Sequence, residues 1–258
     1  MSSEIIHEAR EKRPLIHHLT NQVVMNFTAN GLLSFGGAPI MAKAVEEAEE
    51  MASISDGVLI NIGTILNQDI PAMIQAGKAA NKKGIPVVVD PVGVGATSFR
   101  KEAIRQILEE INPTVIKGNA GELAHLVDIP WEIKGVDSTG EGNSEEIARK
   151  VAQEFKTIAV LTGKTDVISD GTEVRLNRKG SAMLSNVTGA GCLLGSIVTA
   201  CLTTSHSSVE SAFAAVEFYG RAAEYTEGLD EVKGTGTFIA SFLDALSFNP
   251  NDLKGGQE

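Results

Sequence analysis

Four short apolar segments constrain the fold of this chain more than any other feature. All four are rich in β-branched residues, and they span 57–63, 86–90, 114–119 and 157–163. Between them lie stretches with helical periodicity, at 71–83, 99–111 and 144–155. Strands that alternate with helices form βαβ units, in which a parallel sheet is buried on both faces. The pattern therefore predicts an α/β fold with a mostly parallel central sheet.

The remaining elements extend this pattern at both ends. Residues 4–13 and 23–33 are expected to be helical, and Ser144 is a plausible N-cap for the helix that follows it. A hairpin is expected around Asp170-Gly171, followed by helices over 192–202, 207–226 and 237–248. The length of 258 residues suits one large domain or two small ones.

Polar and glycine residues stand where each central strand is expected to end. These endings are Asn61 to Gly63, Asp90 to Gly95, Lys117 to Glu122, and Thr162 to Asp166. Ligands of parallel α/β sheets bind at the carboxyl ends of the strands. Four such endings on one edge therefore favour a shared site over ordinary turn chemistry.

A glycine-rich turn feeds the apolar segment that begins at Leu193. The turn contains Gly189, Ala190, Gly191 and Cys192. A helix that starts there would present free N–H groups and a positive dipole end to an anion such as phosphate. The same position would bias a thiol toward thiolate. The alternative is a tight turn followed by a buried cysteine.

Asp90 and Glu122 are the acids at two of the strand ends. Carboxylates without a histidine or cysteine partner suit a hard cation such as Mg²⁺. The alternative for each is a structural role, as an N-cap for Asp90 and a solvated first turn for Glu122. Together with the cation Lys117 and the glycine turn, they indicate phosphoryl transfer, which needs charge neutralisation and in-line positioning.

Composition and charge exclude several other classes. The formal net charge is −11, which argues against nucleic-acid binding and against an anionic membrane surface. No apolar run reaches the length of a membrane span, and the N-terminus does not resemble a signal peptide. The two cysteines, Cys192 and Cys201, are about 13 Å apart if they share a helix, which is too far for a disulfide. We therefore expect a cytoplasmic protein.

Four segments in order, 21–33, 90–97, 116–122 and 188–192, resemble those of hydroxyethylthiazole kinases. The resemblance runs over nearly the whole chain and implies one domain, 1–258, with a ribokinase-like three-layer sandwich fold. It implies ATP-dependent phosphorylation of 4-methyl-5-(2-hydroxyethyl)thiazole, a salvage step of thiamine biosynthesis. It also implies Mg²⁺ and a homotrimer with thiazole sites at the subunit interfaces.

The resemblance assigns roles to individual residues. It implies thiazole contacts from Met41 and Gly189, ATP contacts from Lys117 and Thr162, and magnesium-side acids at Asp90 and Glu122. Two positions depart from the family pattern. Lys117 stands where arginine is common, which loses the bidentate fork, and Ala190 stands where threonine is common, which removes a hydroxyl.

Other residues are candidates because of their chemistry. Met25 suits a flat sulfur-containing ring. Asn26, which shares a helix face with Asn30, either contacts substrate or serves as a core hydrogen bonder. Ala190, Gly191 and Asn119 are expected on the ATP phosphates. Structural roles are expected of Phe27, Asn21, His17 and His18.

Cys192 is the candidate catalytic residue. We expect it to orient the substrate hydroxyl and to help remove its proton, without acting as a covalent nucleophile.

Three alternatives stay open. The chain could be a ribokinase-like kinase for a pyrimidine, pyridoxal or sugar alcohol, or a dehydratase of hydrated nicotinamide nucleotides. These usually carry aspartate at the position of Cys192. The third alternative is a nucleotide or thiazole sensor without turnover.

Overall fold

The computed structural model describes residues 2–130 and 141–253. Within them eight strands form one sheet in the order β2-β1-β3-β4-β5-β6-β7-β8. The strands are β1 (Leu15–Leu19), β2 (Ala38–Ile40), β3 (Gly57–Asn61), β4 (Val87–Asp90), β5 (Val115–Asn119), β6 (Ile158–Thr162), β7 (Asp166–Ser169) and β8 (Val174–Asn177). Neighbours from β2 to β6 are parallel, and β7 and β8 are antiparallel to their neighbours. The mostly parallel sheet and the hairpin at Asp170-Gly171 are confirmed.

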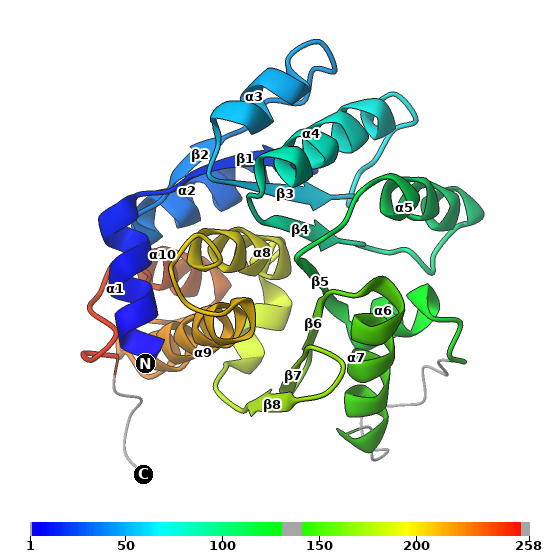
Figure 1. Ribbon diagram of the computed structural model, residues 1–258. Helices are drawn as coiled ribbons and strands as arrows, with labels where there is room; N and C mark the ends of the chain where they lie inside the picture. Colours follow the sequence, from blue (N-terminus) through cyan, green and yellow to red (C-terminus); the bar gives the residue numbers. More distant parts are fainter. Residues whose placement is uncertain (1, 131–140, 254–258) are drawn as a thin grey trace.

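Helices cover both faces of the sheet, which confirms the three-layer sandwich (Figure 1). One face carries α1 (Ser2–Lys12), α2 (Met25–Phe35), α8 (Ala190–Cys201), α9 (Ser208–Glu227) and α10 (Thr235–Ala245). The other carries α3 (Ala48–Ile54), α4 (Asp69–Lys83), α5 (Ser98–Glu110), α6 (Ala120–Leu126) and α7 (Glu141–Phe155). A 3₁₀ helix, η1 (Ala182–Asn186), precedes α8. None of the helices in the described ranges combines the length and the apolar character needed to traverse a bilayer.

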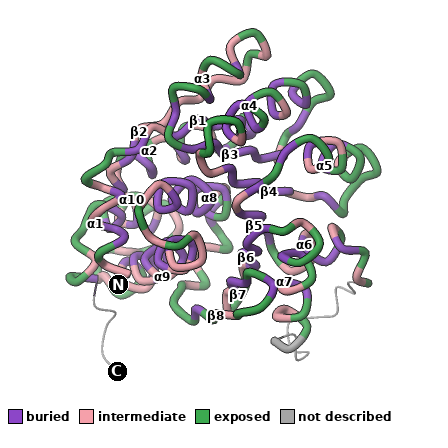
Figure 2. Tube along the Cα trace, viewed as in Figure 1, coloured by how far each residue is buried: buried purple, intermediate pink, exposed green. Residues whose placement is uncertain are grey.

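The alternation of side chains along the central strands produces two hydrophobic cores. Leu59 and Val88 point into the core shared with α8 and α9, whereas Ile60 and Val89 point into the core shared with α4 and α5. All four are fully buried, and burial of such a side chain stabilises the fold by about 1.5–3 kcal/mol. The central strands and α8 are buried along most of their length (Figure 2). These two cores fix the strand ends relative to α8.

Some helix boundaries differ from those predicted. The segment α6 was not predicted, because it is short and follows β5 without a turn. Ser144 lies inside α7, which begins at Glu141, so its predicted role as N-cap is wrong. The helix α8 begins at Ala190, so Cys192 is its third residue. Both cysteines lie in α8 and are free, as expected from their spacing.

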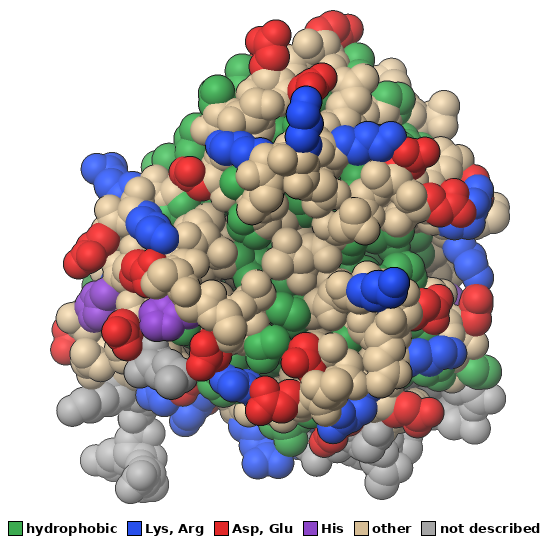
Figure 3. All heavy atoms as spheres, in the orientation of Figure 1, with side chains coloured by type: hydrophobic (Ala, Val, Ile, Leu, Met, Phe, Trp, Pro, Cys, Tyr) green, Lys and Arg blue, Asp and Glu red, His purple; other side chains and the backbone are tan. Residues whose placement is uncertain are grey.

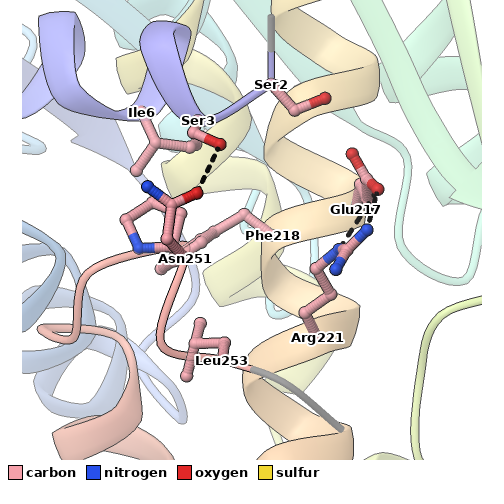
Figure 4. A pocket seen from close by; sticks show the side chains of 9 residues that line it. Ser2, Ser3, Ile6, Glu217, Phe218, Arg221, Asn251 and Leu253 are labelled. Carbon is pink, nitrogen blue, oxygen red and sulfur yellow. Dashed lines mark hydrogen bonds and ion pairs between the residues drawn. The ribbon is translucent and has the colours of Figure 1, made fainter.

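Helix α1 packs against the last described residues of the chain on the α1–α9 side. Arg10 donates hydrogen bonds to the carbonyl oxygens of Phe35, Leu246 and Phe248, and its guanidinium lies over the ring of Phe218. A cavity of about 390 Å³ lies beside this junction (Figure 4). Its polar side chains pair with one another, Ser3 with Asn251 and Glu217 with Arg221. None of the predicted site residues lines this cavity.

Candidate active site

The strand register brings the predicted polar endings to one edge of the sheet. Asn61, the last residue of β3, is opposite Asp90, the last residue of β4. Asn119 at the end of β5 is likewise opposite Thr162 at the end of β6. The expected gathering of these endings is confirmed, and its cause is the parallel pairing of β3 to β6.

The glycine turn places the start of α8 at the same edge. Gly189 has φ +91°, a left-handed conformation that favours glycine, and a Cβ there would lie 2.6 Å from Cγ1 of Val24. The backbone N–H groups of Gly191 and Cys192 have no acceptor among the described residues. Gly191 is also exposed to solvent. The turn therefore presents two free donors at the positive end of a helix, as an anion site requires.

A buried ion pair lies directly behind this turn. Nζ of Lys117 is 3.0 Å from Oδ2 of Asp90 and donates to the carbonyl oxygen of Gly191 over 2.9 Å. Burial raises the pKa of Asp90 to about 6, although the charge of Lys117 opposes this shift. Burial is the largest single influence and lowers the pKa of Lys117, but Asp90, Cys192 and Glu122 together outweigh it, so the pKa is raised. Lys117 is only 3% exposed, so it supports the turn from behind.

Cys192 is held by two amides. Its Sγ accepts hydrogen bonds from Nδ2 of Asn61 over 3.3 Å and from Nδ2 of Asn21 over 3.6 Å. Burial, together with the charge of Asp90, raises the pKa of the thiol, although Lys117 and the two amides oppose this. The expected bias toward thiolate is therefore wrong, because burial and the charge of Asp90 outweigh Lys117 and the two amides, and the thiol is neutral at pH 7.

Glu122 is fixed by backbone donors from two loops. Its Oε2 accepts from the N–H of Asn119 and its Oε1 from the N–H of Gly93, over 2.8 and 2.9 Å. Asn119 in turn caps α6 through its side chain, which completes a capping box. Glu122 thus lies in the first turn of α6, which was the structural alternative to a metal role, and its carboxylate also joins the β4–α5 loop to β5.

The two acids fit a magnesium ion that takes its other ligands from phosphate and water. Oδ1 of Asp90 is buried and has no hydrogen-bond partner among the described residues. Glu122 lies close enough to raise the pKa of Asp90. Within the described residues no cluster of three or more acids, histidines or cysteines could hold a metal. Mg²⁺ commonly uses only one or two carboxylates together with substrate phosphates, so this donor set is sufficient.

A cavity of about 990 Å³ opens beside the glycine turn. Four predicted residues line it, namely Asn119, Thr162, Ala190 and Gly191. In the view of Figure 3, charged side chains gather mainly toward the margin of the molecule, and its middle is mostly hydrophobic side chains, uncharged polar side chains and backbone.

Sequence reasoning missed several residues of this cavity. Lys164, Arg178 and Lys179 bring positive charge to it, and Tyr219 donates a hydrogen bond to the carbonyl oxygen of Ala190. Lys164 belongs to one of the polar strand endings, so its place at this edge has a sequence signal. Nothing in the local sequence marks Arg178, because it follows the hairpin and is brought to the cavity by the tertiary fold.

The predicted thiazole residues Met25, Asn26, Met41 and Gly189 do not line this cavity. Met25 begins α2 and Met41 follows β2; both are half-buried, whereas Asn26 is exposed and accepts a hydrogen bond from Asn30. Gly189 connects the two regions, because a Cβ on it would meet Val24, which immediately precedes α2. The start of α2 is therefore in contact with the turn that forms the anion site.

Three of the expected structural residues have partners within the fold. His17 binds the carbonyl oxygen of Ala42 through Nε2, and His18 binds Oγ of Ser196 over 2.6 Å. Phe27 packs against the core that contains α8, as expected. Asn21 does more than order its loop, because its amide also reaches Cys192.

Comparisons with known proteins show which family the chain belongs to. The Hydroxyethylthiazole kinase family model matches residues 6–251. Hydroxyethylthiazole kinase 1 of Oceanobacillus iheyensis is 56% identical over 257 residues, which is 100% of each chain.

Two solved structures are similar in fold. A hydroxyethylthiazole kinase protein from Pyrococcus horikoshii OT3 is 37% identical, with a TM-score of 0.87 over 95% of this chain and 92% of that one. A ribokinase-like superfamily protein from Enterococcus faecalis V583 shares the fold alone, at 13% identity and a TM-score of 0.67 over 95% and 94% of the two chains. With the full-length match in sequence and the family model over residues 6–251, this chain belongs to the hydroxyethylthiazole kinase family.

Proposed function

We propose that this protein transfers the terminal phosphoryl group of ATP to the hydroxyl of 4-methyl-5-(2-hydroxyethyl)thiazole, a salvage step of thiamine biosynthesis. The observation that carries the proposal is the pair of free N–H groups at Gly191 and Cys192, which open beside a large cavity. Family membership supports the choice of acceptor.

The cavity of about 990 Å³ is the proposed ATP site. Asn119, Thr162, Ala190 and Gly191 line it and are placed to contact the nucleotide. Lys117 contributes its charge from behind the turn. Lys164 and Arg178 add cations on the open side, which a protein of net charge −11 needs locally to attract a polyphosphate.

Asp90 and Glu122 are the residues that would hold Mg²⁺. When bound, the ion neutralises phosphate charge. The chain itself supplies two fixed carboxylates, since Glu122 is anchored by two backbone donors and Asp90 by Asn61 and Lys117.

In the proposed mechanism the acceptor hydroxyl lies near Cys192 and the phosphate near the start of α8. As the new O–P bond forms, the bond from phosphorus to the ADP oxygen breaks, and the two N–H groups stabilise charge on the transferred group. Because the thiol is neutral, Sγ first orients the hydroxyl as a hydrogen-bond partner. The hydroxyl proton then leaves to an oxygen of the transferred phosphoryl group as the O–P bond forms, because a neutral thiol cannot hold a second proton.

The thiazole ring is assigned to Met25, Asn26, Met41 and Gly189, at sites between the subunits of a homotrimer. Two exposed apolar side chains support such an interface. Val23, which lies just before α2, is 66% exposed, and Leu33, which lies in α2, is 56% exposed. The neighbouring β2 is an edge strand of the sheet. Exposed apolar groups next to a free strand edge are typical of protein interfaces.

The reaction is tested by following ADP release in the presence of Mg²⁺. The proposal expects release that depends on the thiazole alcohol, with the phosphate found on its hydroxyl by mass spectrometry. ADP release that depends instead on a hydrated nicotinamide nucleotide would identify a dehydratase. Thiazole or ATP binding without turnover would identify a sensor. Either result would refute the proposal.

The trimer is tested by sedimentation equilibrium of the wild type and of Leu33→Asp. We expect a trimer for the wild type and smaller species for the variant, with weaker thiazole binding. A monomeric wild type with full activity would overturn the interface assignment.

A further inference from the structure

The side-chain amide of Asn61 has every hydrogen-bonding position occupied. Oδ1 accepts from Nδ2 of Asn21 and from the N–H of Gly63, both over 2.9 Å. Nδ2 donates to Oδ2 of Asp90 over 2.9 Å and to Sγ of Cys192 over 3.3 Å. An amide has two hydrogens and two acceptor lone pairs, so Asn61 is saturated. Its exposed fraction is 1%, so water does not compete.

This saturation fixes which way the amide faces. If the amide were turned over, its oxygen would face the Asp90 carboxylate and its hydrogens would face the N–H donors of Gly63 and Asn21. Both contacts would then be repulsive inside a buried site. Nδ2 of Asn61 must therefore donate toward Cys192.

The fixed amide of Asn61 also determines how the thiol of Cys192 is oriented. Sγ receives N–H donors from Asn61 and Asn21, so these two sides of the sulfur are used as acceptor sites. A thiol sulfur has two lone pairs and both are used, so the S–H hydrogen must point away from both amides. Cys192 stands in the first turn of α8, beside the free N–H groups, so its open side is the side on which a phosphoryl acceptor would lie.

We propose that Asn61 is a positioning residue, which orients the thiol of Cys192 toward the phosphoryl acceptor by donating a hydrogen bond to Sγ from a locked amide. This inference rests on the proposed function, and it deepens the role of Cys192. No other side chain of similar size can make all four hydrogen bonds of Asn61. Aspartate would place an acceptor against both Asp90 and the sulfur, and alanine would leave the N–H of Gly63 and the amide of Asn21 without a partner.

The test is a double-mutant cycle on Asn61→Asp and Cys192→Ala. We expect Asn61→Asp to lower kcat by about tenfold or more, while KM for ATP changes by less than about threefold, because Asn61 does not line the ATP cavity. In the Cys192→Ala background the same substitution should lower kcat clearly less than in the wild type, because the part of the loss that passes through Sγ is gone while the repulsion with Asp90 remains. An equal loss in both backgrounds would overturn the inference and assign the effect to Asp90 or to folding.

Two controls keep the test decisive. Asn81→Asp introduces the same charge at the far end of α4, where the amide of Asn81 binds the backbone of Asn112, and it should leave kcat unchanged. If Asn61→Asp does not fold, Asn61→Ser replaces it in the cycle, because serine removes the donor to Sγ without adding charge beside Asp90. Thermal unfolding of each variant confirms that the folded state is compared.

A readout independent of turnover separates this inference from the proposed function. In a Cys201→Ala background, Cys192 is the only cysteine, and its alkylation by iodoacetamide reports on the thiol directly. We expect the rate at one fixed pH to fall several-fold in Asn61→Asp and in Asn61→Ser, but not in Asn81→Asp. An unchanged rate in folded Asn61 variants would refute the positioning role, even if thiazole phosphorylation is observed. A fall in rate without any thiazole phosphorylation would refute the proposed function alone.

Discussion

The ammonium of Lys117 lies 3.0 Å from Oδ2 of Asp90, and the two side chains are only 4% and 1% exposed. This ion pair connects β5 to β4 and also reaches the carbonyl oxygen of Gly191 at the start of α8. Lys117 stands where the family pattern commonly has an ATP-contacting arginine. In this protein the lysine is buried and has two partners inside the protein.

Removing the lysine is expected to destabilise the protein strongly. Lys117→Met leaves Asp90 buried without its counter-charge, which should cost about 3–5 kcal/mol of unfolding free energy, measured by urea denaturation. Lys78→Met is the control, because Lys78 pairs with Glu110 at the surface and should cost less than about 1 kcal/mol. Equal effects of the two substitutions would show that the buried pair has no special role.

Substitutions of Cys192 should lower turnover without abolishing it. Cys192→Ser is expected to reduce kcat by up to about a hundredfold, because the anion site remains. Cys192→Asp should retain substantial activity, since a carboxylate at this position can bind the hydroxyl and take up its proton. Steady-state kinetics would measure both, and complete inactivity of a folded Cys192→Asp would count against a role of this side chain at the hydroxyl.

No covalent intermediate on the cysteine is expected. Intact-mass spectrometry during turnover should find the unmodified protein, and a stable cysteinyl adduct would overturn this. Cys201→Ser is the matched control on the same helix, because Cys201 is fully buried in the core away from the polar network. The Cys201→Ser substitution should lower the stability of the protein more than it lowers kcat.

Gly189 should tolerate no side chain. In Gly189→Ala the new Cβ would lie 2.6 Å from Val24, and φ of +91° adds backbone strain. We expect KM for the thiazole alcohol to rise and kcat to fall together, because the turn and the start of α2 move apart.

The control for this substitution is Gly84→Ala. Gly84 has φ +75°, but a Cβ added there would have no atom within 4 Å, so this variant reports the backbone strain alone. It should cost about 1–2 kcal/mol of stability with unchanged kinetics. If Gly189→Ala behaves in the same way, the contact with Val24 does not shape the site.

Stability should fall in mild acid because of His18. Burial lowers the pKa of His18 to about 4, from 6.5 in an exposed histidine. Between these values the unfolded chain binds a proton that the folded chain does not, so unfolding becomes more favourable as the pH falls. The loss should approach about 3 kcal/mol near pH 4.

Urea unfolding at about pH 7 and about pH 5 tests this expectation. The difference between the two free energies should be smaller in His18→Gln, which lacks the titrating ring and can still bond Oγ of Ser196. An identical pH dependence in wild type and variant would assign the acid sensitivity to other groups.

The sequence alone determined the architecture and the edge that carries the site. Apolar β-branched strands alternating with helices require a parallel sheet buried on both faces, and parallel strands bring their carboxyl ends together. The endings at Asp90, Asn119 and Thr162 therefore had to meet. The anion site at the Gly189 turn could also be predicted from the sequence, because glycines before an apolar helix are a local signal of such a site.

Only the tertiary structure decided how the polar side chains at that edge pair with one another. Asn61 and Cys192 are 131 residues apart, and no local pattern indicates that they are bonded. The neutral state of the thiol likewise depends on burial, which is produced by packing of α8 on the sheet. Periodicity and turn chemistry are properties of neighbours in sequence, whereas hydrogen-bond partners and desolvation are set by contacts between distant segments.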